Sequence, residues 1–216
     1  MHPLSEALRH GLSTLGLVLD ATQQQQLLDY QDLIVKWNKV YNLTAVRDAH
    51  EMLTHHLLDS LAVVQPLLQQ LQNLPHKSPF RLLDVGSGAG LPGVVIAICC
   101  PEIQVNCVDT VAKKATFIQQ VALTLKLGNL TGLHARVESI QTHNFDVVVS
   151  RAFASLQDFT QWSSGALAPQ GIWMALKGKH PAQELQVLSS NVKVFHVEPL
   201  KVPGLNADRC ILWLRG

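Results

Sequence analysis

The chain has 216 residues, of which 47% are hydrophobic, and it carries 17 Lys and Arg against 16 Asp and Glu. A chain of this length and hydrophobicity can bury an ordinary core, which excludes an intrinsically disordered protein. A formal net charge of +1 gives no overall sign of a nucleic-acid-binding protein. The small basic excess lies in residues 80–216, with 12 Lys and Arg against 9 Asp and Glu.

The N-terminus and the cysteines favour a cytoplasmic protein. The first 20 residues lack the basic segment, apolar run and cleavage site of a signal peptide. No stretch of about 18 apolar residues is present to cross a membrane. The four cysteines have no spacing typical of a metal site or a disulfide framework: Cys99, Cys100, Cys107 and Cys210. We therefore expect buried thiols in a reducing compartment, and no metal.

Two amphipathic helices are predicted in a helical region formed by residues 1–79. In residues 20–41, with Asp20 as the N-cap, apolar side chains recur at helical spacing: Leu27, Tyr30, Ile34, Trp37 and Tyr41. In residues 47–68, Asp48 and Glu51 form a capping-box pattern, and one face carries Leu53, Leu57, Leu61 and Val64. Residues 72–80 are rich in turn formers and are the expected junction with the second domain, residues 80–216.

Strand-length apolar runs alternate with helical stretches in the second domain. The strands are predicted at 81–85, 104–109, 130–135, 145–150 and 171–176, and the helices at 92–100, 113–127 and 156–167. This alternation indicates an α/β fold with a doubly wound, mostly parallel, Rossmann-like sheet. Two β-rich runs in residues 192–216 predict an antiparallel hairpin at the sheet edge.

The loop after the first predicted strand carries two overlapping signatures. Residues 82–95 read LLDVGSGAGLPGVV. Gly88, Gly90 and Gly93 match the G-x-G-x-x-G of dinucleotide sites, whereas Asp84 and Gly86 extend the pattern to the D-x-G-x-G-x-G of methyl donors. Both kinds of site need glycines where the backbone approaches a ligand.

Charge favours the methyl donor over the dinucleotide. A carboxylate at Asp84 would oppose a pyrophosphate at the helix N-terminus, whereas it would complement the ammonium and sulfonium of S-adenosylmethionine. Asp109, at the end of the second predicted strand, can accept both ribose hydroxyls of an adenosine. That feature is common to NAD and methyl-donor sites, so an NAD-binding oxidoreductase stays an alternative.

The segment after the fourth predicted strand, FDVVVSRAFASL, limits the kind of methylation. It lacks the Asn/Asp-Pro-Pro-aromatic motif of exocyclic-amine methylases, and no cysteine lies there to act as the nucleophile of a pyrimidine carbon methylase. N-7 of guanine has a free lone pair and no proton to lose, so its methylation needs alignment and no general base. The sequence therefore identifies no catalytic residue, and the catalytic residues stay unknown.

Several segments resemble the RsmG family, also called GidB, a family of bacterial methyltransferases of small-subunit ribosomal RNA. In chain order they are WNKVYNLTAVRDAHEMLTHHLLDSLAV, LLDVGSGAGLPG, ARVES, FDVVVSRAFASL and ALKG. The resemblance runs from about residue 20 to the C-terminus. It implies a class I methyltransferase fold and methylation of N-7 of one guanine in 16S ribosomal RNA, with S-adenosylmethionine as the cofactor.

The resemblance also implies cofactor contacts. These fall on Gly86 and Leu91 in the glycine loop, Val137 and Glu138 in ARVES, and Arg151 in SRAF. Leu91 can cover the ligand, Val137 can pack on adenine and Glu138 can bond its edge. The alternative for Val137 and Glu138 is an ordinary strand-to-helix cap.

Two basic residues close predicted strands. Arg151 can pair with the methionine carboxylate, an RNA phosphate or a guanine edge, and its alternative is a salt bridge at the edge of the core. Lys177 is a candidate for an RNA phosphate, or else is simply solvated. Asn42, His55 and His56 could line the RNA approach, but a helix histidine is more often a surface residue, so we assign them to no site.

We therefore expect a monomeric RNA methyltransferase. Its substrate would be 16S ribosomal RNA within the small ribosomal subunit or an assembly intermediate, because a weak basic excess disfavours tight binding to naked RNA. The alternatives are a methyltransferase acting on a small molecule or a protein, the NAD-binding oxidoreductase, and an assembly factor without turnover.

Overall fold

A single seven-stranded sheet organises the chain in the computed structural model, which describes residues 2–75, 79–153 and 155–216. The strands are β1 (Phe80–Val85), β2 (Ile103–Asp109), β3 (Leu130–His134), β4 (Phe145–Ser150), β5 (Leu167–Lys177), β6 (Lys193–Leu200) and β7 (Arg209–Arg215). Their order in the sheet is β3-β2-β1-β4-β5-β7-β6. The first five are parallel, and β7 runs antiparallel to both β5 and β6. The predicted α/β class and C-terminal hairpin are confirmed, with β7 rather than β6 joining the hairpin to β5.

Among the described residues, six helical segments precede β1: α1 (Ser5–Thr14), α2 (Ala21–Tyr41), α3 (Ala49–Met52), the π-helix η1 (Leu53–Leu58), α4 (Asp59–Leu61) and α5 (Val64–Gln72). The segments that follow β1 are α6 (Gly93–Cys99), α7 (Ala112–Thr124), the 3-10 turn η2 (Val137–Ser139), α8 (Leu156–Ser163) and α9 (Ala182–Gln186). Within the described part of the chain, no helix has the length and apolarity needed to span a bilayer.

The N-terminal region differs from its prediction in two places. Helix α1 was not expected, and the predicted second helix is interrupted by the π-helix η1 and by a turn before α5. Both predicted caps are confirmed: the Asp20 carboxylate accepts from the N–H of Gln23, and Asp48 accepts from two N–H groups of α3. Residues 76–78 of the predicted junction lie outside the described residues.

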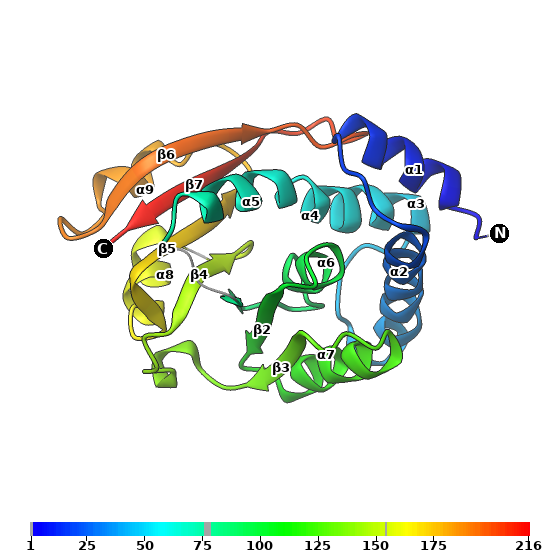
Figure 1. The fold of residues 1–216 in the computed structure, drawn as a ribbon, viewed down its shortest axis with the longest axis horizontal. Helices are drawn as coiled ribbons and strands as arrows, with labels where there is room; N and C mark the ends of the chain where they lie inside the picture. Colours follow the sequence, from blue (N-terminus) through cyan, green and yellow to red (C-terminus); the bar gives the residue numbers. More distant parts are fainter. Residues whose placement is uncertain (1, 76–78, 154) are drawn as a thin grey trace.

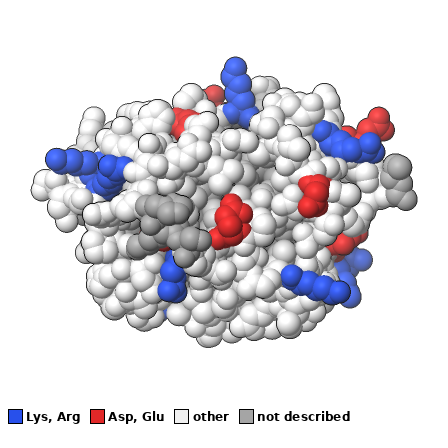
Figure 2. Space-filling model, viewed as in Figure 1, with Lys and Arg blue, Asp and Glu red and all other residues white. Residues whose placement is uncertain are grey.

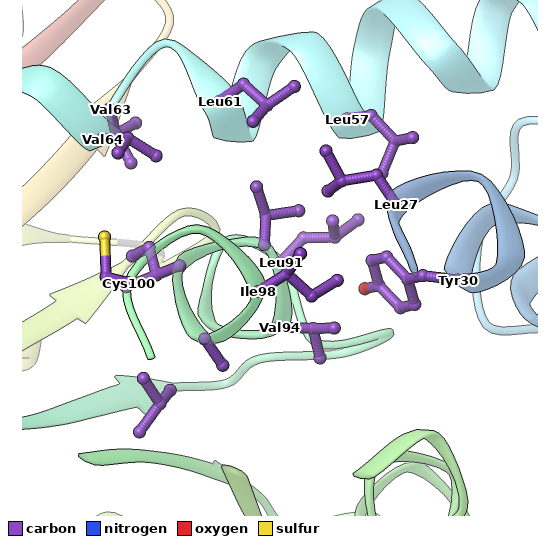
Figure 3. Close-up of a cluster of buried hydrophobic side chains, with 14 of the residues drawn as sticks. Leu27, Tyr30, Leu57, Leu61, Val63, Val64, Leu91, Val94, Ile98 and Cys100 are labelled. Carbon is purple, nitrogen blue, oxygen red and sulfur yellow. The ribbon is translucent and has the colours of Figure 1, made fainter. Parts of the chain in front are cut away.

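Side-chain alternation along the strands divides the core into two layers, one on each face of the sheet that Figure 1 draws as a ribbon. Leu82 of β1 belongs to one apolar cluster together with α1, α2, α6 and α7, whereas Leu83 and Val85 belong to the other together with α8. Figure 3 shows the first cluster, in which Leu27 and Tyr30 of α2 lie beside α6. The N-terminal helices therefore share one core with the sheet, and the helices cover both of its faces.

The cysteines are structural. All four are free of disulfides, and Cys99 alone among them is partly exposed. Burial raises the pKa of the Cys100 thiol to about 12 and that of Cys107 well above its usual value, so these thiols stay protonated. Among the described residues, no three His, Cys, Asp or Glu side chains gather where they could hold a metal ion.

Asp84 connects β1 to α6 through a buried hydrogen bond. Its Oδ2 accepts from the Gly93 N–H at 2.8 Å, and its Oδ1 has no hydrogen-bond partner among the described residues. A Cβ on Gly93 would lie 2.8 Å from Oδ2, so only glycine lets the helix start this close to the strand. Burial raises the pKa of the Asp84 carboxyl to about 7, although the Gly93 N–H and the Arg151 guanidinium oppose the shift.

The raised pKa of Asp84 predicts a pH-dependent stability. The native carboxyl binds its proton more tightly than the unfolded one, whose pKa is about 3.9, so its contribution is full below about pH 4 and is lost as pH rises through about 7. Asp84→Asn should therefore flatten the fall in melting temperature between pH 5 and pH 8, measured by thermal unfolding. The exposed control Glu102→Gln should keep the wild-type dependence. An unchanged slope in Asp84→Asn would contradict a protonated native carboxyl.

Candidate cofactor and substrate site

A cavity of about 330 Å³ opens where β1, β2 and β4 end. It contains four of the predicted site residues, Gly86, Asp109, Val137 and Glu138, and it is also lined by Val85, Val108, Thr110, Ala135, Arg136, Ala152, Phe153 and Trp162. Its position is the one at which open α/β sheets bind ligands, outside the carboxyl ends of the strands. Its size lies within the range of small-molecule sites.

The glycine loop forms one side of this cavity without filling it. Gly86 and Gly88 have φ angles of +66° and +60°, a region that L-residues with a side chain seldom adopt. A Cβ at either position would meet no atom within 4 Å. Glycine is therefore required here by the backbone conformation, and the space beside the loop stays open for a ligand.

Asp109 is held at the end of β2 by the loops around it. Its Oδ2 accepts from the Gly88 N–H at 3.0 Å and its Oδ1 from the Val111 N–H at 2.9 Å, while Lys114 Nζ lies 3.6 Å from Oδ2. Each carboxylate oxygen has two acceptor positions, so both keep capacity for a ligand hydroxyl. This carboxylate fits a pair of ribose hydroxyls.

The other end of the cavity is apolar. Val137 is 6% exposed, and Phe153 packs against Phe159 with the rings tilted and against Trp162 edge to face, with ring centroids 5.5 Å apart in each pair. Trp162 is 42% exposed, an unusual position for a large aromatic side chain. Sequence reasoning missed Phe153 and Trp162; the signal was an aromatic residue directly after SRA and another on the helix that follows. Together these side chains fit the two faces of an adenine ring.

The position of Asp84 gives a clear reason to exclude a bound dinucleotide. It gives less reason to expect that this acid binds the positively charged group of a methyl donor. A pyrophosphate would bind at the N-terminus of α6, but the Asp84 carboxyl already accepts from the first N–H of that helix. Asp84 is fully buried and does not line the cavity. Its expected contact with a cationic ligand is therefore corrected: alternation in β1 turns this side chain toward α6, away from the ligand.

Leu91 also lies away from the cavity. It is 3% exposed and packs in the apolar cluster with Leu57, Leu61 and Tyr30 (Figure 3). The glycine loop reverses direction before Leu91, which turns this apolar side chain into the core between α6 and the N-terminal helices. Phe153 and Trp162, by contrast, line the cavity.

Arg151 and Lys177 line a second cavity of about 310 Å³ instead of the first. Arg151 Nη1 donates to Asp59 Oδ2 at 3.2 Å and to the His55 carbonyl at 3.1 Å, so the salt-bridge alternative describes its contacts in this structure, and its cofactor contact stays a prediction. Lys177 Nζ pairs with Glu184 at 2.9 Å. Asp59 and Arg209 were not predicted, because their partners are far away in the sequence.

Several solved structures have a similar fold. TrmN from Thermus thermophilus matches with a TM-score of 0.55 and 19% identity over 76% of this chain and 53% of that chain. An S-adenosylmethionine-dependent methyltransferase from Aquifex aeolicus matches with a TM-score of 0.54 and 15% identity over 72% of this chain and 92% of that chain. Identities this low establish the fold alone.

Sequence comparison establishes the family. A protein from Polaromonas naphthalenivorans called ribosomal RNA small subunit methyltransferase G is 67% identical over 98% of this chain and 96% of its own length. A protein of the same description from Albidiferax ferrireducens is 66% identical over 100% of this chain and 98% of its own length. The family model GidB, described as rRNA small subunit methyltransferase G, matches residues 23–212. The chain therefore belongs to the GidB family of small-subunit ribosomal RNA methyltransferases.

Proposed function

We propose that this protein transfers a methyl group from S-adenosylmethionine to N-7 of a guanine in 16S ribosomal RNA. The observation that carries the proposal is the cavity at the carboxyl ends of β1, β2 and β4, in a chain that belongs to the GidB family. It combines an open glycine loop, a carboxylate at Asp109 and an apolar slot, which together fit a nucleoside without a pyrophosphate.

Four predicted residues would hold the cofactor. Asp109 would accept from the ribose hydroxyls, and Gly86 would let the backbone approach the ligand. Val137 would pack on the adenine ring, with the exposed Glu138 near its edge. Arg151 and Leu91 lie outside this set.

Methyl transfer to N-7 of guanine requires the protein to align the guanine with the methyl donor. When bound, S-adenosylmethionine supplies an electrophilic methyl group, and N-7 of guanine supplies a lone pair without losing a proton. Good orientation can contribute about 7–11 kcal/mol to such a displacement. The residues that place the guanine relative to the cofactor cavity are therefore more important than any general base.

The substrate would be the small ribosomal subunit or an assembly intermediate. On the face shown in Figure 2, the described Lys and Arg side chains are separated by uncharged surface and do not gather in one broad patch. Binding to naked RNA depends strongly on the number of phosphates that basic residues neutralise. A particle that presents the guanine in a defined position fits this weakly charged surface better. The protein would act as a monomer, in the compartment where ribosomes assemble.

Replacing Asp109 tests the cofactor site. Asp109→Asn should weaken binding of S-adenosylhomocysteine by about tenfold or more, because the amide cannot accept from both ribose hydroxyls while it serves the two loop N–H groups. Isothermal calorimetry measures this, with the exposed Glu102→Gln as the control that should bind as the wild type does. NADH should give no binding heat. Wild-type affinity in Asp109→Asn would reject the assigned site.

Trp162 offers a spectroscopic test of the adenine slot. S-Adenosylhomocysteine should change the tryptophan emission of the wild type, because Trp162 lines the cavity whereas Trp173 and Trp213 are 3% and 0% exposed. Trp162→Phe should abolish the change, and Trp37→Phe, on α2, should keep it. Binding should be confirmed by calorimetry in all three proteins. A change that persists in Trp162→Phe would place the adenine elsewhere.

Mapping 7-methylguanosine tests the reaction itself. Borohydride–aniline cleavage of ribosomal RNA should show one 16S site in cells that carry the gene and none in cells that lack it. Purified protein should restore the site on small subunits from the deletion strain more efficiently than on protein-free 16S RNA. Identical cleavage patterns in the two strains would refute the proposed function, and equal activity on naked RNA would refute the particle as substrate.

A further inference from the structure

The second cavity lies directly beside the first. It is lined by His55, Asp59, Val63, Arg151, Leu176, Lys177, Gly178, Leu200, Arg209 and Cys210. The segment after β4 separates the two cavities, since Arg151 lines the second whereas Ala152 and Phe153 line the first. Lys177 lines the second cavity, and its Nζ donates at 3.4 Å to the carbonyl of Phe153, which lines the first. A nucleotide held in the second cavity would therefore be next to the cofactor.

Asp59 is the centre of the second cavity. It begins α4 immediately after the π-helical turn, a feature often found at functional sites. It is 6% exposed, and its two oxygens hold different guanidinium groups: Oδ1 accepts from Arg209 Nε at 2.8 Å, and Oδ2 accepts from Arg151 Nη1 at 3.2 Å. One carboxylate thus joins the end of β4, the start of β7 and the N-terminal helices.

The two arginines keep unused donors. Arg209 also donates from Nη1 to the Asp208 carbonyl, and Arg151 donates from Nη1 to the His55 carbonyl. No hydrogen bond among the described residues uses Nη2 of either arginine. Each side chain is 27% exposed, so these donors are accessible to a ligand.

The charges around the cavity favour an anion. Asp59 can neutralise only one of its two arginine partners, and Glu184 neutralises Lys177, so one positive charge remains uncompensated. Two planar guanidinium groups with free N–H donors match the oxygens of a phosphate. Guanine is a poorer match, because its N1–H and amino group need acceptors, whereas the free groups of both arginines are donors.

We propose that Arg151 and Arg209 form a clamp for a backbone phosphate of the RNA strand that presents the target guanine, and that Asp59 is the positioning residue that holds the clamp. This inference rests on the proposed function. In the clamp, Asp59 prevents the two guanidinium groups from separating, and a phosphate bound there fixes the strand relative to the cofactor cavity. In the clamp, Arg151 acts on the RNA.

The test combines Arg209→Gln with a control on the same strand. Arg215, at the opposite end of β7, lies 4.4 Å over the Phe195 ring and is remote from the cavity lining. Methylation of small subunits is measured over a series of salt concentrations. Arg209→Gln should lower kcat/KM about tenfold and reduce the slope of log kcat/KM against log salt by about 0.7–0.9, the effect of one lost phosphate contact. Arg215→Gln should keep the wild-type values.

Asp59→Asn examines the positioning role. It leaves both arginines in place, yet it should raise KM for the subunit and reduce the salt slope as Arg209→Gln does. A residue that only stabilised the fold would lower the melting temperature and leave the slope unchanged. S-Adenosylhomocysteine affinity, measured by calorimetry, should stay within about twofold of the wild type in both variants, since neither residue lines the cofactor cavity.

The outcomes separate the clamp from the proposed function. A wild-type salt slope in Arg209→Gln, or in Asp59→Asn, overturns the clamp while leaving the methyltransferase reaction intact. A loss of cofactor affinity in Arg209→Gln that equals its loss of activity also overturns it. Absence of methylation by the wild-type protein refutes the proposed function, and the clamp with it.

Discussion

The hydrogen bond between the Asp84 carboxyl and the Gly93 N–H determines how the rest of the site is built. It brings the end of β1 and the start of α6 together in the protein interior, at a distance that tolerates no side chain on Gly93. The glycine loop between them must then turn sharply, with Gly86 and Gly88 at positive φ, and this turn leaves the cofactor cavity open. A buried acid whose pKa is raised to about 7 thus supports the ligand site without lining its cavity.

The same hydrogen bond explains why the literal dinucleotide motif is misleading. Gly88, Gly90 and Gly93 have the spacing of a pyrophosphate site, but the helix N-terminus that would bind the pyrophosphate already has an acceptor within the chain. The cofactor class expected from charge is correct, but the expected role of Asp84 is partly wrong. Asp84 disfavours a dinucleotide because it occupies the end of α6, and not because it pairs with a cation in the cavity.

The N-terminal helices contribute a carboxylate to the second cavity as well as apolar side chains to the core. They pack on the same face of the sheet as α6 and α7, and this packing carries Asp59 to the carboxyl end of β4. Without that carboxylate, Arg151 and Arg209 would be neighbouring cations that repel each other. The boundary expected near residue 79 therefore separates two sequence patterns, while one shared core and one ion-pair network connect the regions on either side of it.

Much of the fold could be predicted from local pattern. Apolar periodicity located α2 and all five parallel strands, and the turn residues in 201–208 located the hairpin. The interruption of the helix after Asp48 could not be predicted, because Leu53, Leu57 and Leu61 fit an uninterrupted α-helix, and the contacts of the π turn with α1 and α2 form only in the folded chain. Helix α1 was missed for a related reason, since Leu4, Leu8 and Leu12 become a buried face only when the rest of the core is present.

The sequence by itself determined the fold class, the glycine loop, Asp109 as the acid that ends β2, and the family, because strand ends and motif spacing are local properties of the chain. Only the tertiary structure decided which way the side chains point and which distant residues meet. It turned Asp84 and Leu91 into the core, brought Phe153 and Trp162 to the cofactor cavity, and joined Asp59 to Arg209 across 150 positions. The physical reason is that side-chain direction and the pairing of distant residues depend on how whole helices and strands pack. A short stretch of sequence does not determine that packing.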